Sequence, residues 1–173
     1  MCGIAGILGH QIPVDLLEQK GRRMIDTLHH RGPDSDGIWV SPDDDLVLTH
    51  KRLAIQDLSE HGHQPMFSRS KRYCVVFNGE IYNFKELERE LAKHGHHFSG
   101  HSDTEVLLAA IEEWGLVNAV QRFIGMFAFA LWDNTEKSFH LCRDRLGEKP
   151  LYYGWVGKDF YFASELKAID LEL

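Results

Sequence analysis

The sequence has little of what marks secreted, membrane-bound or fibrous proteins. Only three of its 173 residues are cysteines, an odd number that is too small for a disulfide scaffold. No apolar run approaches the roughly 18 residues that a membrane helix requires, and the first residues lack the basic start of a signal peptide. Repeats, low-complexity tracts and linkers are also absent. These absences favour a reduced, cytoplasmic protein with one domain over residues 1–173.

Positive charge is scarce as well. The chain has 19 Lys and Arg against 26 Asp and Glu, which gives a formal net charge of −7. Because nucleic-acid binding needs a cationic face, neither nucleic acid nor a membrane is an expected partner. Hydrophobic residues make up 43% of the chain and charged residues 26%, which is ordinary for a globular domain with a substantial core.

Short apolar segments predict strands on both sides of a helical middle. Helices are expected over residues 14–28, 83–95, 102–115 and 116–123. Strands are expected over residues 4–8, 46–55, 73–77, 126–132, 138–143, 151–155 and 160–163, and residues 31–37 have the composition of a turn-rich loop. Strands that flank helices, instead of alternating with them, indicate an α+β fold with antiparallel sheets.

Cys2 is the most informative candidate residue. If Met1 is removed, a thiol and a free α-amine stand on the same residue. The ordinary pKa of that amine is about 8, so part of it is unprotonated near neutral pH and can act as the base for the thiol. Taken alone, a cysteine here is better explained as a small buried hydrophobic residue at the start of a strand.

Five further positions could complete a site. Asn78 and Gly79 end a β-prone run and can supply two donors to an oxyanion, although Asn-Gly alone is a common turn. Arg52 can form a bidentate fork for a carboxylate, or a structural ion pair. Asp103, with Glu80, can hold an ammonium group, although an acidic residue also suits the start of a helix. Spacing alone decides none of these cases.

Seven stretches together resemble the glutaminase domain of class II glutamine amidotransferases, most closely that of glutamine-dependent asparagine synthetase. They are MCGIAG (1–6), HRGPDS (30–35), RLAI (52–55), FNGEIYN (77–83), SDTE (102–105), GMFAFA (125–130) and RDRLGEKPLYY (143–153). They follow the family order and cover nearly the whole chain. RGPDS and EIYN favour the asparagine synthetase branch, although amidotransferases of polysaccharide and antibiotic pathways share this domain.

The resemblance implies an N-terminal-nucleophile hydrolase fold, a four-layer αββα sandwich of two antiparallel sheets. It also implies a reaction. Cys2, freed from Met1, attacks the side-chain amide of glutamine, and its own amine transfers the proton. Asn78 and the Gly79 backbone form the oxyanion hole. A thioester forms, ammonia leaves, and water then releases glutamate.

The same resemblance implies how glutamine is bound. Arg52 holds the α-carboxylate, and Asp103 with Glu80 holds the α-ammonium. Backbone groups around Ile55 and Gln56 line the rest of the pocket. A zwitterion with a neutral amide needs these groups, and a site built around specific hydrogen bonds can reject close analogues.

An ATP-using step has no matching motif in this chain. No phosphate loop of the Walker or pyrophosphatase type is present, so the chain by itself should release ammonia. We expect it to be the N-terminal part of a longer polypeptide, with ATP and Mg bound only in a synthetase domain that follows. The expected partner is that C-terminal synthetase domain in cis or an associated ammonia acceptor. The resemblance leaves room for a homodimer.

The eleven histidines raise the question of a metal site. Six of them cluster in polar loops: His61, His63, His94, His96, His97 and His101. They lack nearby cysteines and the defined spacing of zinc sites. We therefore expect neither a metal nor a cofactor in this domain.

Two other functions stay open. One is an N-terminal-nucleophile amidohydrolase for another amide, such as an acylase, which Arg52 and Asp103 disfavour because they suit an amino acid. The other is a non-catalytic glutamine-binding domain, which the intact Cys2 disfavours. Glutamine that protects against unfolding without turnover would support the binding domain.

Overall fold

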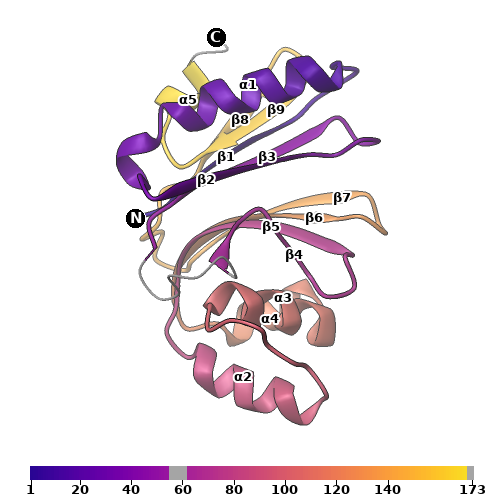
Figure 1. The fold of residues 1–173 in the computed structure, drawn as a ribbon, viewed down its shortest axis with the longest axis vertical. Coiled ribbons are helices and arrows are strands. Elements are labelled where there is room, and N and C mark those ends of the chain that lie inside the picture. Colours follow the sequence, from indigo (N-terminus) through magenta and orange to yellow (C-terminus); the bar gives the residue numbers. More distant parts are fainter. Residues whose placement is uncertain (55–61, 171–173) are drawn as a thin grey trace.

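The computed structural model describes residues 1–54 and 62–170, which form four layers (Figure 1). The helices are α1 (Val14–Asp26), η1 (His29–Arg31, a 3₁₀ turn), α2 (Phe84–Lys93), α3 (Asp103–Trp114), α4 (Leu116–Arg122) and α5 (Lys167–Asp170). The strands are β1 (Gly3–Leu8), β2 (Ser35–Val40), β3 (Leu46–Arg52), β4 (Met66–Phe67), β5 (Tyr73–Ile81), β6 (Gly125–Asp133), β7 (Ser138–Arg143), β8 (Tyr152–Val156) and β9 (Asp159–Ala163). Two sheets face each other, with α1 and α5 outside one and α2 to α4 outside the other. This confirms the expected αββα sandwich.

Both sheets are antiparallel throughout. One has the strand order β2-β3-β1-β9-β8, and the other has the order β4-β5-β6-β7. β1 is the central strand of the first sheet, bonded to β3 on one side and β9 on the other. The residue before β1 is therefore held at the end of the central strand, with strands on both sides of it.

Three apolar clusters hold the layers together, one under each helical layer and one between the sheets. β5 contributes to two of them. Tyr73, Val75 and Phe77 face the helices, whereas Cys74 and Val76 face the other sheet. A strand that is buried on both faces has a continuous apolar sequence instead of an alternating one.

The helices α2, α3 and α4 agree closely with expectation, apart from the cap that Asn83 could supply to α2. α3 starts after Ser102, whose Oγ accepts a hydrogen bond from Glu105 N at 3.3 Å, and it ends at Gly115, where φ is +76°. Asn83 stands at the start of α2, but its side chain makes no capping bond and instead accepts from Ile124 N at 3.0 Å. Within the described ranges, none of the helices has the length and apolar character needed to cross a membrane.

The largest differences from expectation concern strands and the first helix. Residues 35–40, partly assigned to a loop, form β2 because they pair with β3 along their whole length. β5 continues to Ile81 because β6 pairs with it throughout. Asn78 and Gly79 therefore lie inside a strand, and both the strand end at Phe77 and a turn here are wrong. The helix α1 ends at Asp26, and Val14 is exposed instead of buried.

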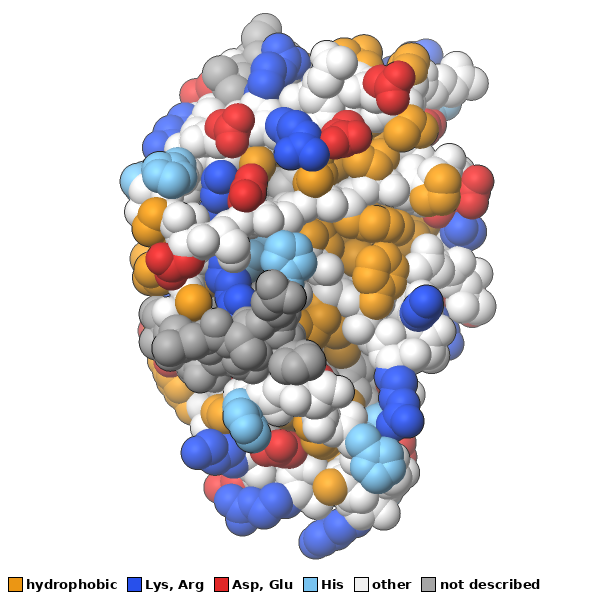
Figure 2. All heavy atoms as spheres, viewed as in Figure 1, with side chains coloured by type: hydrophobic (Ala, Val, Ile, Leu, Met, Phe, Trp, Pro, Cys, Tyr) orange, Lys and Arg blue, Asp and Glu red, His pale blue; other side chains and the backbone are white. Residues whose placement is uncertain are grey.

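The two sheets also meet at their outer edge. Figure 2 shows hydrophobic side chains gathered between the two layers on one face of the molecule. Trp39 of β2 and Phe67 of β4 meet edge to face, with ring centroids 5.3 Å apart. This contact joins the two edge strands, so the sheets are fixed relative to each other on this side of the pocket described next.

Candidate active site

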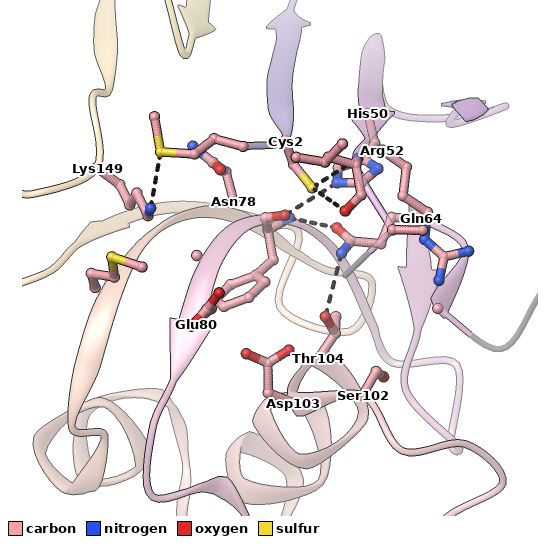
Figure 3. A pocket seen from close by; sticks show the side chains of 17 residues that line it. Cys2, His50, Arg52, Gln64, Asn78, Glu80, Ser102, Asp103, Thr104 and Lys149 are labelled. Carbon is pink, nitrogen blue, oxygen red and sulfur yellow. Dashed lines mark hydrogen bonds between the residues drawn. The ribbon is translucent and has the colours of Figure 1, made fainter. Parts of the chain in front are cut away.

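A pocket of about 310 Å³ lies where the start of β1, the end of β3, the strand β5 and the start of α3 meet (Figure 3). It is lined by Met1, Cys2, His50, Arg52, Leu53, Ala54, Gly62, Gln64, Phe77, Asn78, Gly79, Glu80, Ser102, Asp103, Thr104, Met126 and Lys149. The structure thus brings together six predicted site residues: Cys2, Arg52, Asn78, Gly79, Glu80 and Asp103. The other two, Ile55 and Gln56, lie outside the described residues.

Cys2 lies directly before β1, with its side chain in the pocket. Its thiol is 3.7 Å from the carbonyl oxygen of Leu53, to which it donates, and it accepts from Leu53 N at 3.4 Å. Arg31 Nε donates to the carbonyl oxygen of Cys2 at 2.9 Å, and Arg31 is held in turn by Glu165. Burial raises the pKa of the Cys2 thiol. At neutral pH the thiol is therefore protonated and needs a base before it can attack.

Within the part of the chain that the structure describes, β4 is the one strand on the outer edge of β5, and it pairs with only two residues of β5. In an antiparallel strand the N–H groups of alternate residues face the same edge. Phe77 N donates to Oε1 of Gln64 at 2.6 Å. Ile81 N donates to Oδ2 of Asp103 at 2.9 Å. Gly79 lies midway between them, so its N–H faces the same edge, into the pocket.

The Asn78 side chain offers a second donor. It is 1% exposed, and its Nδ2 has no hydrogen-bond partner among the described residues. A buried polar group without a partner is unfavourable by about 1–3 kcal/mol and often marks a binding site. Gly79 is needed next to it because β6 passes close by, and a Cβ there would lie 2.6 Å from the Cα of Phe127. The pocket wall thus carries two donors beside Cys2.

Arg52 is the last residue of β3 and supplies the cationic group. Alternate residues of a strand share a face, so His50 and Arg52 both line the pocket, whereas Lys51 pairs with Asp36 at 3.4 Å on the other side. The guanidinium lies against Gly62, where any Cβ would overlap it. The arginine head is therefore packed as well as charged, which suits recognition of a planar carboxylate.

Asp103 supplies the anionic group at the start of α3. It is 6% exposed, and burial is the main cause that raises its pKa from 3.8 to about 6, with a further contribution from the negative charge of Glu80. A bound cation would favour the ionised form of this carboxyl. The pair of carboxylates therefore fits an ammonium group, on the side of the pocket opposite Cys2 in Figure 3.

Several buried residues of the pocket were not predicted as site residues, and His50, Gln64 and Lys149 are among them. The Nζ of Lys149 lies 3.1 Å from the sulfur of Met1. The spacing of two between His50 and Arg52 was a usable signal, because it places both side chains on one face of a strand. Gln64 and Lys149 carry no such pattern, since their positions depend on contacts between distant segments.

We expect His50 to make the fold sensitive to acid. Burial, as the main cause, lowers the pKa of His50 from 6.5 to about 3, so the folded state binds one proton fewer than the unfolded state between those values. The free energy of unfolding should then fall by about 1.4 kcal/mol for each pH unit below 6.5 on account of this residue. Denaturant unfolding of wild type and His50→Gln from pH 7 to pH 4 should show this difference in slope.

The matched control for this measurement is His10→Gln, at an exposed histidine. Parallel pH profiles for wild type and His50→Gln would contradict the prediction. Gln retains an N–H₂ group that can reach the Phe77 carbonyl oxygen, to which His50 Nε2 now donates at 3.2 Å.

The histidine clusters have other partners in the fold. His94 and His96 both bond Glu113, at 2.9 and 3.0 Å. His61 lies outside the described residues. Within residues 1–54 and 62–170, no group of three or more His, Cys, Asp or Glu side chains is placed to hold a metal ion.

Comparison with known proteins gives a consistent picture of the whole chain. Residues 1–172 match the family described as a glutamine amidotransferase domain. The asparagine synthetase (glutamine-hydrolyzing) 3 of Bacillus subtilis is 43% identical over 171 residues, which cover 98% of this chain and 27% of that protein. The asparagine synthetase (glutamine-hydrolyzing) 3 of Arabidopsis thaliana is 43% identical over 173 residues, which cover 98% and 28%. This chain therefore spans little more than a quarter of these relatives.

A solved structure supports the fold independently. The glutamine phosphoribosylpyrophosphate amidotransferase of B. subtilis, complexed with ADP and GMP, superposes with a TM-score of 0.83 at 24% identity. The match covers 99% of this chain and 43% of that one. At this identity the match concerns the fold alone.

Proposed function

Because the chain belongs to the glutamine amidotransferase domain family, we propose that it hydrolyses the side-chain amide of glutamine to glutamate and ammonia, with Cys2 as the nucleophile. One observation carries this proposal. Two donors face the pocket beside Cys2: the buried Nδ2 of Asn78, which no described residue bonds, and the N–H of Gly79. Two such donors suit the oxyanion that forms when a thiol attacks an amide.

The charged groups of the pocket match the two ends of an amino acid. Arg52 would bind the α-carboxylate in a bidentate fork, and Asp103 with Glu80 would bind the α-ammonium. Arg52 and the two carboxylates line the same pocket as Asn78 and Cys2. With the α-carbon of glutamine held by these charged groups, the amide at the end of the glutamine side chain would reach Cys2. Ile55 and Gln56 are expected to contribute to the same pocket. An acylase substrate without the two charged groups would make no use of the Arg52 guanidinium or the Asp103 carboxylate.

The reaction runs through a thioester. The thiol of Cys2 adds to the amide carbon, its proton passes to the α-amine of the same residue, and the oxygen becomes an oxyanion held by Asn78 and Gly79. The oxyanion collapses, the C–N bond breaks, and the amine returns the proton to the leaving nitrogen, which departs as ammonia. Water then adds to the thioester carbon and gives up a proton to the amine, the C–S bond breaks to release glutamate, and the amine returns its proton to the thiolate.

This chemistry requires removal of Met1. While Met1 is present, the nitrogen of Cys2 is an amide and cannot accept a proton, and the Met1 side chain lines the pocket. A cysteine is small enough as second residue for methionine aminopeptidase, so we expect the mature chain to start at Cys2. The raised pKa of the thiol supports the need for this base.

For the whole protein, the longer relatives suggest the destination of the ammonia. We infer that the chain works in cis with a synthetase domain of the asparagine synthetase type, which amidates its acceptor with ATP and Mg. In that arrangement glutamine is the only small molecule this domain binds, no cofactor is needed here, and the reaction takes place in the cytoplasm.

The test is glutamate release from glutamine by the purified chain, with the N-terminal mass recorded on the same sample. Chain that has lost Met1 should release glutamate and ammonia in equal amounts, whereas chain that retains Met1 should release neither. Asparagine, which is one methylene shorter, should react at least about tenfold more slowly.

Two outcomes would contradict the proposal. Full activity of chain that retains Met1 would exclude the amine as base. No turnover by chain without Met1, combined with a rise in melting temperature on adding glutamine, would identify a glutamine-binding domain instead.

A further inference from the structure

We propose that Gln64 is a positioning residue for the oxyanion hole, because it bonds the edge of β5 where none of the described residues forms a neighbouring strand. The inference rests on the glutaminase function proposed above. Gln64 precedes β4 and is 5% exposed. Figure 3 shows its amide between the backbone of β5 and the side chain of Thr104.

Both polar atoms of the Gln64 amide are engaged. Oε1 accepts from Phe77 N at 2.6 Å, and Nε2 donates to Oγ1 of Thr104 at 3.3 Å. The first bond reaches the residue immediately before Asn78. The second reaches the residue immediately after Asp103. One side chain thus connects the strand that carries the oxyanion-hole donors with the helix that carries the ammonium-binding carboxylate.

The Phe77 backbone is fixed on the same edge by a second side chain. His50 Nε2 donates to the carbonyl oxygen of Phe77 at 3.2 Å. In a regular sheet, the N–H and C=O of one residue would both bond a single residue of the neighbouring strand. Here Gln64 and His50 replace that neighbour, and the carbonyl that His50 holds belongs to the peptide that links Phe77 to Asn78.

Because Gln64 and His50 bond Phe77 in place of a neighbouring strand, the space beside Gly79 stays open. A continuous strand beside β5 would also bond Gly79, and its N–H could not reach a substrate. The side chains of Gln64 and Asp103 accept from the backbone N–H groups of Phe77 and Ile81, on either side of Gly79. They fix the strand there and leave the N–H of Gly79 facing the pocket. An oxyanion hole acts through donors held in place before the reaction, and a displacement of about 1 Å is enough to lower the rate strongly.

The other edge of β5 does not depend on Gln64. β6 pairs with β5 along its full length, from Tyr73 opposite Asp133 to Ile81 opposite Gly125. Loss of the Gln64 bonds should therefore leave the strand formed but less precisely placed. That predicts a defect in the chemical step without a comparable defect in glutamine binding.

The test is Gln64→Met, which keeps an unbranched side chain of similar length and removes both hydrogen bonds. We expect kcat for glutamate release to fall about 10- to 100-fold, whereas KM for glutamine changes less than about threefold. Inhibition by the γ-aldehyde analogue of glutamine provides a second readout. Its carbonyl adds the Cys2 thiol to form a thiohemiacetal whose oxygen occupies the hole, so its affinity should fall in step with kcat. Inhibition by glutamate should be unchanged.

The matched control is Thr49→Val, which removes a different buried hydrogen bond, from Thr49 Oγ1 to the Ala5 carbonyl oxygen at 2.8 Å, outside the pocket. It should lower the melting temperature by a similar amount and leave kcat unchanged. If Gln64→Met does not fold, Thr104→Val removes only the bond from Gln64 to the helix, and kcat should fall about three- to tenfold.

The outcomes separate this inference from the function on which it rests. A wild-type chain without turnover contradicts the proposed function. An active wild type together with wild-type kcat in both variants overturns the role of Gln64 alone. A rise in KM with unchanged kcat also overturns it, because Gln64 would then contribute to binding instead of to the oxyanion hole.

Discussion

Replacing Cys2 with alanine is expected to reduce glutamate release to the background rate, a loss of at least about 10⁴-fold. Alanine removes the only sulfur that can form the thioester at this position, while the α-amine and the donors of Asn78 and Gly79 stay in place. Alanine is also small enough as second residue for Met1 to be removed. The measurement is glutamate release at saturating glutamine, with the N-terminal mass of each protein recorded.

The matched control is Cys142→Ala, at another partly buried cysteine that packs beside the helical layer outside the pocket. It should retain wild-type turnover. Cys2→Ala should still bind glutamine, because Arg52 and Asp103 are unchanged, so glutamine should raise its melting temperature as it does for wild type. Residual turnover above background in Cys2→Ala would show that another group is the nucleophile.

Replacing Asp103 with asparagine is expected to weaken glutamine binding while it stabilises the fold. The substituted side chain can still accept from Ile81 N, but it no longer offers a charge to the α-ammonium, and KM should rise about 30- to 1,000-fold. The buried carboxyl, with its pKa raised to about 6, opposes folding when it is ionised. Its removal should add about 1–3 kcal/mol to the free energy of unfolding at pH 7. Denaturant unfolding and steady-state kinetics check the two parts.

The stability difference between Asp103→Asn and wild type should depend on pH, which distinguishes it from the effect of a general change in packing. The folded pKa of Asp103 lies above its unfolded value, so the unfavourable contribution is complete above pH 6 and disappears as the pH falls toward 4. The stability advantage of Asp103→Asn should therefore be present at pH 7 and absent near pH 4. An advantage that is constant over this range, or no advantage at pH 7, would contradict the account.

The presence of the candidate site residues in one pocket could be predicted largely from the sequence, because these residues lie in short motifs whose residue types indicate a chemistry. The structure brings Cys2, Arg52, Asn78 and Asp103 into one pocket although 101 positions separate the first from the last. That convergence followed from the family resemblance. Spacing alone left every one of these positions with an ordinary structural explanation.

The geometry of Asn78 and Gly79, the proposed oxyanion-hole donors, could not be predicted in the same way. The sequence placed Asn78 and Gly79 at the end of a strand, whereas β5 continues past them to Ile81. The strand that ends is its neighbour, β4, and its two residues are too short for a sequence pattern. Gln64 bonds the outer edge of β5 at Phe77, a residue 13 positions further along the chain. No local periodicity in the sequence predicts such a contact.

The strand β2 shows a second limit of prediction from the sequence. Its sequence, SDGIWV, begins within a stretch that is rich in turn-forming residues, and its strand character comes from pairing with β3 from Ser35 opposite Arg52 to Val40 opposite Val47. Tertiary pairing here overrides local preference. The boundaries of helix α3 could be predicted because Ser102 and Gly115, which directly flank it, are local signals for the start and the end of a helix.

The central place of β1 has a practical consequence for handling the protein. Six residue pairs fix the register of β1 against β3, and four more fix it against β9. A chain with extra residues before Cys2 therefore cannot shift its register by one position to place its own terminal amine beside the thiol. An affinity tag fused upstream of Cys2 should therefore yield a folded protein that captures glutamine but never releases product. Such a fusion would be a ready-made substrate trap, and preparations intended for turnover should carry their tag at the opposite end.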